Sequence, residues 1–78
     1  MDMDEAIRRV KACGWVGVLV WDMQPKGFMA CLFDQKEGVS FQTNLWDYAK
    51  TPNEALISIV EKAERNPQNV QDGLVNPD

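Results

Sequence analysis

The side chains that could take part in chemistry are two thiols and a set of carboxylates, because the 78 residues contain no histidine. Histidine is the usual general base, the usual partner of a serine or cysteine nucleophile, and the commonest zinc ligand. Cys13 and Cys31 fall within apolar patterns, and two thiols are too few for a four-ligand zinc site. We therefore expect buried, reduced cysteines, no metal and no cofactor.

The carboxylates offer a second route to chemistry, since paired acids can exchange protons with a substrate. Asp22 and Asp34 stand near the ends of the two strands of the predicted first hairpin, and Asp47 follows Trp46. No metal motif and no glycine-rich phosphate loop accompanies them. Charged groups that keep the sheet edges soluble explain these acids better than catalysis does, and the sequence predicts that the protein is not an enzyme.

The charge balance limits the partners. Twelve acidic and eight basic residues give a net charge of −4, which disfavours nucleic-acid phosphates as direct partners. A mildly acidic surface permits binding to a basic protein, including a nucleic-acid-binding protein, although the same charge also simply favours solubility. No apolar run approaches the roughly 20 residues of a membrane helix, and the N-terminal segment is acidic where a signal peptide is basic, so we expect an intracellular protein without a membrane partner.

Capping signals define two helices. Asp2 and Glu5 form a capping box for a helix that begins at Met3 and stops near Gly14. The second helix follows Thr51 as N-cap, Pro52 at the first helical position and Glu54 at the third, and it ends at 66–67.

Three β-rich segments lie between the helices, at 15–23, 28–34 and 39–45, joined by turns at 24–27 and 35–38. The order predicts an α+β fold, α-β-β-β-α, with a three-stranded antiparallel meander sheet and two helices packed on it. We expect one domain over 1–66 and a polar tail over 67–78. Trp15 and Trp21, on one face of the first strand, are expected in the core.

The first two strands are apolar on both faces, whereas the third alternates between apolar and polar residues. The sequence does not decide whether the helices share one face of the sheet. If they do, the second face of the first hairpin must find another chain. The first strand would also be an apolar edge, so we expect homodimerisation either through this edge, with Val16, Val18 and Val20, or through one face of the sheet.

Aromatic residues in the predicted connection at 46–50 are the best candidates for a binding surface. Trp46 and Tyr48 flank a charged residue, as interface anchors do, although one of them could instead fold over the sheet end as a lid on the core. The candidate partner interface comprises Trp46, Asp47, Tyr48, Asp22, Asp34 and Glu37.

Two family likenesses bear on the partner. The α-β-β-β-α order is that of double-stranded-RNA-binding domains, but those carry a basic cluster where this chain reads TPNEA at 51–55, so RNA is not expected. The start MDMDEAIRR and the helix beginning Thr51-Pro52-x-Glu54-Ala55-Leu56 resemble small phage domains described as α-β-α sandwiches.

The phage resemblance implies an accessory or anti-defence protein of the anti-CRISPR type, acting in the bacterial cytoplasm. Its expected role is to inhibit a host defence or nucleic-acid-binding complex by occupying a functional surface. Two alternatives stay open. One is a homo-oligomer that sequesters a small nucleotide signal, with Trp46 and Tyr48 stacking on the base, and the other is a phage structural or regulatory protein.

Overall fold

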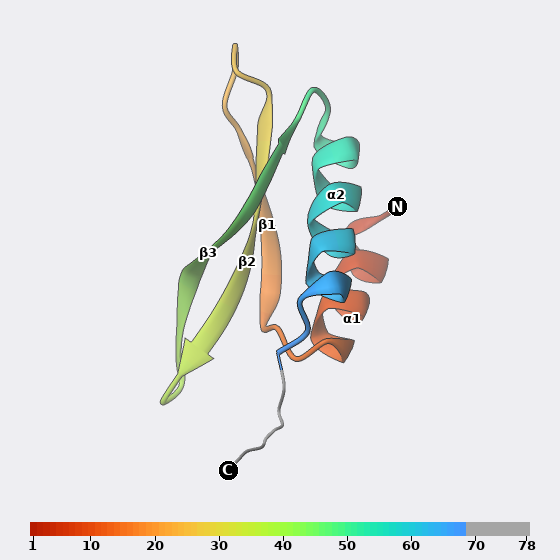
Figure 1. Cartoon of the computed structure of the whole chain (residues 1–78). Coiled ribbons are helices and arrows are strands. Elements are labelled where there is room, and N and C mark those ends of the chain that lie inside the picture. Colours follow the sequence, from red (N-terminus) through yellow and green to blue (C-terminus); the bar gives the residue numbers. More distant parts are fainter. Residues whose placement is uncertain (69–78) are drawn as a thin grey trace.

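The computed structural model describes residues 1–68 and confirms the predicted α+β fold. The elements are α1 (Met3–Ala12), β1 (Gly17–Asp22), β2 (Phe28–Lys36), β3 (Val39–Ala49) and α2 (Pro52–Arg65). The strands form one antiparallel sheet in the order β1-β2-β3, so β2 is central, as the short turns predicted (Figure 1).

Both helices begin where the capping signals place them. The Asp2 carboxylate accepts a hydrogen bond from the Glu5 backbone N–H at 2.8 Å, and the Thr51 hydroxyl accepts one from the Glu54 N–H at 3.1 Å. Each of these bonds satisfies an N–H that has no partner within the helix.

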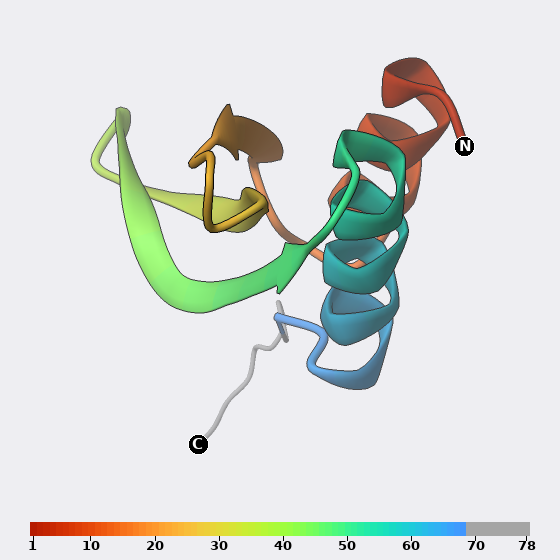
Figure 2. The ribbon, with the colours of Figure 1, turned by 90° about the horizontal axis from the view of Figure 1, so that it is seen from above.

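The two helices lie on the same face of the sheet, which settles the question that the sequence left open. Figures 1 and 2 show α1 and α2 side by side on one side of the strands. The core between the two layers is built from alanines, branched aliphatic side chains and one tryptophan: Ala6, Val10, Trp15, Val18, Ala30, Leu32, Ala55, Leu56, Ile59, Val60 and Ala63.

The turn between β1 and β2 passes so close to the end of β3 that only glycine fits at position 27. Gly27 has a φ of 102°, and a Cβ placed there would lie 2.5 Å from the carbonyl oxygen of Ala49. The left-handed backbone and the close approach both exclude other residues. Between β2 and β3 the connection is the two-residue pair Glu37-Gly38, both with positive φ, as tight hairpin turns require.

The third strand is longer than predicted, because β3 continues through Trp46 and Tyr48 to Ala49. The expectation that 46–50 forms a loop was therefore wrong. Three β3 residues, 43–45, stand opposite the single residue Leu32, and this irregularity bends β3 (Figure 2). The Thr43 hydroxyl stabilises the bend by donating to the Leu32 carbonyl at 2.8 Å and accepting from the Leu45 N–H at 3.1 Å.

The first strand begins at Gly17, two residues later than predicted, and this separates the two tryptophans that were expected together in the core. Trp15 precedes the strand, is only 8% exposed, and donates its indole N–H to the Asn66 carbonyl at 3.2 Å. Trp21 belongs to β1 and is absent from the core cluster. The expected core position is thus correct for Trp15 and wrong for Trp21.

The helices leave the far end of the β2–β3 hairpin uncovered. Val39 and Phe41, which were expected on the apolar face of the third strand, are exposed there.

In the part of the predicted tail that the structure describes, the Gln68 N–H donates to the Cys13 carbonyl at 2.8 Å. The rest of the predicted tail, 69–78, lies outside the described residues. Within 1–68, no helix has the length and apolar character that a membrane crossing requires.

Candidate interaction surface

The second face of the sheet carries a continuous set of side chains with no helix over them. Val18 and Val20 on β1, and Ala30 and Leu32 on β2, pack into or against the core beneath the helices. Because successive strand residues point to opposite faces, their neighbours face the other way. We call this side the open face and define it by nine residues: Gly17, Leu19, Trp21, Met29, Cys31, Phe33, Gln42, Trp46 and Tyr48.

The bend in β3 does not change which face its residues occupy. Phe33 pairs with Gln42 and Cys31 pairs with Trp46, so β3 advances four residues where β2 advances two. The two additional residues preserve the alternation of faces. Gln42, Trp46 and Tyr48 consequently lie on the same face as Phe33 and Cys31.

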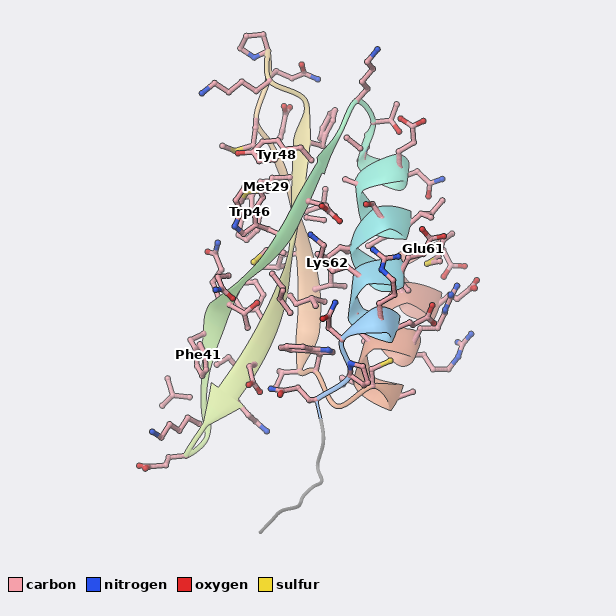
Figure 3. All side chains as sticks on the ribbon, in the orientation of Figure 1. Met29, Phe41, Trp46, Tyr48, Glu61 and Lys62 are labelled. Atoms are coloured by element: carbon pink, nitrogen blue, oxygen red, sulfur yellow. The ribbon has the colours of Figure 1, made fainter. Side chains whose placement is uncertain are left out.

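Trp46 and Tyr48 form a ridge along the β3 side of the open face. Their ring centroids are 5.3 Å apart at an interplanar angle of 84°, an edge-to-face arrangement, and the two side chains remain 45% and 44% exposed. Met29 is the cross-strand partner of Tyr48, and Figure 3 places it beside both aromatic residues. Such half-exposed, mutually packed aromatic residues are typical of interface anchors.

The β1 side of the open face is also apolar. Leu19 is 49% exposed, and the Trp21 and Phe33 rings pack at 6.2 Å between centroids. Gly17 interrupts the row: a Cβ built there meets no other atom within 4 Å, so the surface is low at this point.

Cys31 occupies the centre of the open face and is covered by its neighbours. It pairs with Leu19 on one side and Trp46 on the other, and its thiol donates to the Thr43 carbonyl at 3.3 Å. Burial raises the pKa of the Cys31 thiol, so the neutral form is favoured. This agrees with the burial expected of Cys31. Cys13 is only half-buried and packs against the core, so the expected full burial is wrong for this residue.

A polar clamp beneath β3 holds the aromatic ridge in place. The Asp47 carboxylate accepts from the Ser58 hydroxyl at 2.8 Å and from the Lys62 ammonium at 3.0 Å, and Lys62 also donates to the Trp46 carbonyl at 3.1 Å. These bonds tie β3 to α2 at Asp47. Since the Asp47 side chain points toward the helix, Trp46 and Tyr48 must point outward (Figure 3).

The predicted interface acids do not join the two aromatic residues. Asp47 belongs to the clamp on the helix side of the sheet. Asp22 accepts from the Gln24 N–H at 3.0 Å near the first turn, and Asp34 accepts from the Gln68 side-chain amide on the core side. Glu37 lies in the β2–β3 turn. The structure therefore brings Trp46 and Tyr48 together and separates the four acids from them.

The valines named for a dimer strand also lie apart from the open face. Val18 is buried under the helices, Val20 packs against the core, and Val16 precedes β1. Their side chains do not form an exposed apolar strip. Pairing through the backbone of the β1 edge stays a prediction.

Leu19, Trp21, Met29 and Phe33 were not named as site residues from the sequence. The signal that could have found them was the apolar character of both strand faces, combined with helix stripes sufficient for only one face.

No charged side chain belongs to the open face, which contrasts with the helix layer. There, Arg9 pairs with Glu64 at 2.8 Å and with Glu5 at 3.5 Å. Asp72 and Asp78 lie outside the described residues, which leaves ten carboxylates and eight cations on 1–68. The described part of the surface is thus nearly balanced, and its charge is kept off the open face.

The open face is a surface without a cavity. Across residues 1–68 there is no pocket, and no cluster of three or more potential metal ligands. An apolar face of this kind suits a macromolecular partner better than a small ligand, which is normally held in a concave site.

Comparison with known proteins places no family beside this fold. No family model, no curated protein and no solved structure matches the chain. The resemblance to small phage domains therefore remains a prediction.

Proposed function

We propose that this chain is a non-enzymatic protein-binding module that works through the open face. The single observation that carries the proposal is the continuous, uncharged apolar face opposite the helices, with the Trp46–Tyr48 ridge half-exposed on it. Exposed apolar patches of this extent on small proteins usually mark interaction sites. Trp and Tyr are also the residues that most often dominate binding energy at the centre of an interface.

The arrangement favours protein over nucleotide as the bound partner. Trp46 and Tyr48 could stack on a base, but no lysine or arginine lies on the open face to pair with a phosphate. Lys62, which donates to the Trp46 carbonyl, is engaged on the helix side with Asp47. Nothing in the site favours the nucleotide-sequestering alternative.

The resemblance to small phage domains supports a more specific form of this proposal, in which the partner is a subunit of a host defence or nucleic-acid-binding complex. Binding would cover a functional surface of that complex and inhibit it. The open face would supply contact by shape and apolar burial, since its lack of charge offers no mimicry of a phosphate backbone.

The test is site-specific photo-crosslinking in a bacterial lysate. A photoreactive residue at Gln42, on the open face, should crosslink to protein, whereas the same residue at Glu61, exposed on α2, should not (Figure 3). Crosslinking from Gln42 should be lost in Trp46→Lys and retained in Val39→Lys, which alters an exposed apolar residue at the hairpin end. Equal crosslinking from both positions would contradict the proposal.

The inhibitory form needs a second readout. If the crosslinked protein belongs to a nuclease complex, the purified chain should inhibit that nuclease and Trp46→Lys should not. Crosslinking without inhibition would retain the binding surface and reject the inhibitory role.

A further inference from the structure

We infer that the occupant of the open face is a second copy of this chain, packed sheet against sheet in a two-fold symmetric dimer. The inference rests on the proposed function, because it names the partner of the same surface.

Charge distribution favours a second copy on this face over one on the helix layer. The charged side chains of 1–68, ten carboxylates and eight cations, lie off the open face, so two copies that met through the helix layer would have to desolvate charged groups. On the open face there is no charge, and packing through it leaves the helices on the two outer sides. The charged layers are then separated by both sheets and the roughly 10 Å between them, beyond a Debye length of about 8 Å.

The sheet edges are poorer sites for self-association than the face. Strand β3 is bent where residues 43–45 oppose Leu32, and bends of this kind protect an edge from pairing. Strand β1 ends at Asp22, an exposed carboxylate, and a charged residue on an edge strand disfavours pairing. The open face has no comparable protection.

The shape of the face is compatible with its own copy. The cross-strand rows are Leu19–Cys31–Trp46 and Trp21–Met29–Tyr48. A two-fold axis parallel to the strands places β3 of each copy over β1 of the other, as in aligned sheet packing. Trp46 then covers Leu19 of the second copy, and Tyr48 covers Trp21 of the second copy.

A third row, Gly17–Phe33–Gln42, completes this arrangement. The two-fold axis sets Gln42 over the low point at Gly17 of the second copy.

The area is sufficient for a weak, reversible dimer. An aromatic side chain has roughly 150–250 Å² to bury, so the exposed fractions of Trp46 and Tyr48 leave about 70–110 Å² each. With Leu19, Trp21, Met29 and Phe33 the face offers several hundred Å² per copy, at the low end of specific interfaces, which average about 800 Å² per partner. We therefore expect exchange between monomer and dimer at micromolar concentration.

The test is sedimentation velocity of the purified full chain from low micromolar to near-millimolar concentration. The unmodified chain and the control Val39→Lys should sediment faster as concentration rises. Gly17→Lys and Trp46→Lys should remain monomeric, with a dissociation constant raised about 100-fold or more, because each buries an unpaired charge. Gly17→Lys adds a side chain into open space, so the monomer fold should be unaffected, which circular dichroism checks.

Three other outcomes would each overturn part of this inference. A chain that stays monomeric at every concentration overturns the second copy as occupant, while crosslinking from Gln42 to a different protein still supports the proposed function. Dimerisation that survives Trp46→Lys but not Gly17→Lys indicates pairing through the β1 edge and overturns the sheet-against-sheet arrangement. Dimerisation that survives both substitutions overturns the open face as the dimer interface.

Discussion

The two faces of the three-stranded sheet differ in what covers them. The two helices cover one face, and the other is the open face, which we propose binds a partner. The covered face buries small and branched residues against two helices, with Ala30 and Leu32 fully buried. The open face carries larger side chains, among them Trp21, Trp46 and Tyr48, that stay partly in water. Both faces are apolar, but among the nine residues of the open face only Cys31 is buried.

The largest expected effect is a difference in the free energy of unfolding between one leucine substitution on the covered face and one on the open face. Leu32→Ala on the covered face should lower the free energy of unfolding by about 2–5 kcal/mol, because Leu32 is fully buried and leaves a cavity. Leu19→Ala, at a position 49% exposed on the open face, should cost about 1 kcal/mol or less in the monomer. Urea unfolding at a dilute concentration measures both.

Equal losses at the two leucines would remove the distinction between the faces. At high protein concentration Leu19→Ala should cost more stability than it does in the monomer, because it then also loses the stabilisation that dimerisation adds. Leu32→Ala should show no such additional loss beyond its effect on folding.

A smaller effect is expected from the clamp that connects the faces. Lys62→Met removes the hydrogen bonds to Asp47 and to the Trp46 carbonyl, and should cost about 1 kcal/mol after allowance for partial exposure of the pair. Because the clamp holds β3 beneath the ridge, the near-ultraviolet circular dichroism of the aromatic residues should also change.

Glu61→Met is the matched control, since Glu61 is exposed on the same helix. It should leave the near-ultraviolet spectrum unchanged. A spectrum that responds equally to both substitutions would show that Lys62 does not position the ridge.

The smallest effect concerns the helix layer alone. The hydrogen bond from Arg9 lowers the pKa of Glu64 below its ordinary value of 4.5. A carboxyl with a lowered pKa in the folded state stabilises the fold above its unfolded pKa, and that contribution is lost as the pH falls through the folded pKa. The stability difference between the unmodified chain and Glu64→Gln should therefore shrink as the pH falls below about 4.5.

Thermal unfolding across this pH range, at low and moderate salt, checks the prediction. Added salt should reduce the difference, because the Arg9–Glu64 pair is largely exposed. Open-face substitutions should show no such pH dependence. A difference that is unchanged at pH 3 would contradict the role of this pair.

Local signals in the sequence were sufficient for the fold. The caps at Asp2 and Thr51 and the turns around Gly27 and Gly38 fixed the element order and the meander. These features act over a few residues, so a single sequence reveals them.

The incorrect predictions concern residues whose structure depends on contacts with distant parts of the chain. The sequence at 46–50 reads as a connection because it mixes aromatic and charged residues. Residues 46–49 form strand because they pair with residues 28–31 of β2. Asp47 also meets Ser58 and Lys62, which stand 11 and 15 residues later in the chain. The same contact moves Asp47 away from Trp46 and Tyr48, which no local pattern could indicate.

The sequence predicted an uncovered face only if both helices lie on the same side of the sheet. The apolar pattern of 15–33 showed that two faces needed cover, but helix placement is a property of the packed chain. Once both helices lie on one face, Leu19, Trp21, Met29 and Phe33 become surface residues and join the aromatic ridge.

The most direct test of the open face is the dilution of the chain while its three tryptophan indole N–H signals are followed by NMR. The indole of Trp15 is hydrogen-bonded to the Asn66 carbonyl within the core and serves as an internal control. We predict that the Trp21 and Trp46 signals shift with concentration and the Trp15 signal does not. Three signals that stay fixed at every concentration, or a shift confined to Trp15, would contradict the assignment of the open face as a self-binding surface.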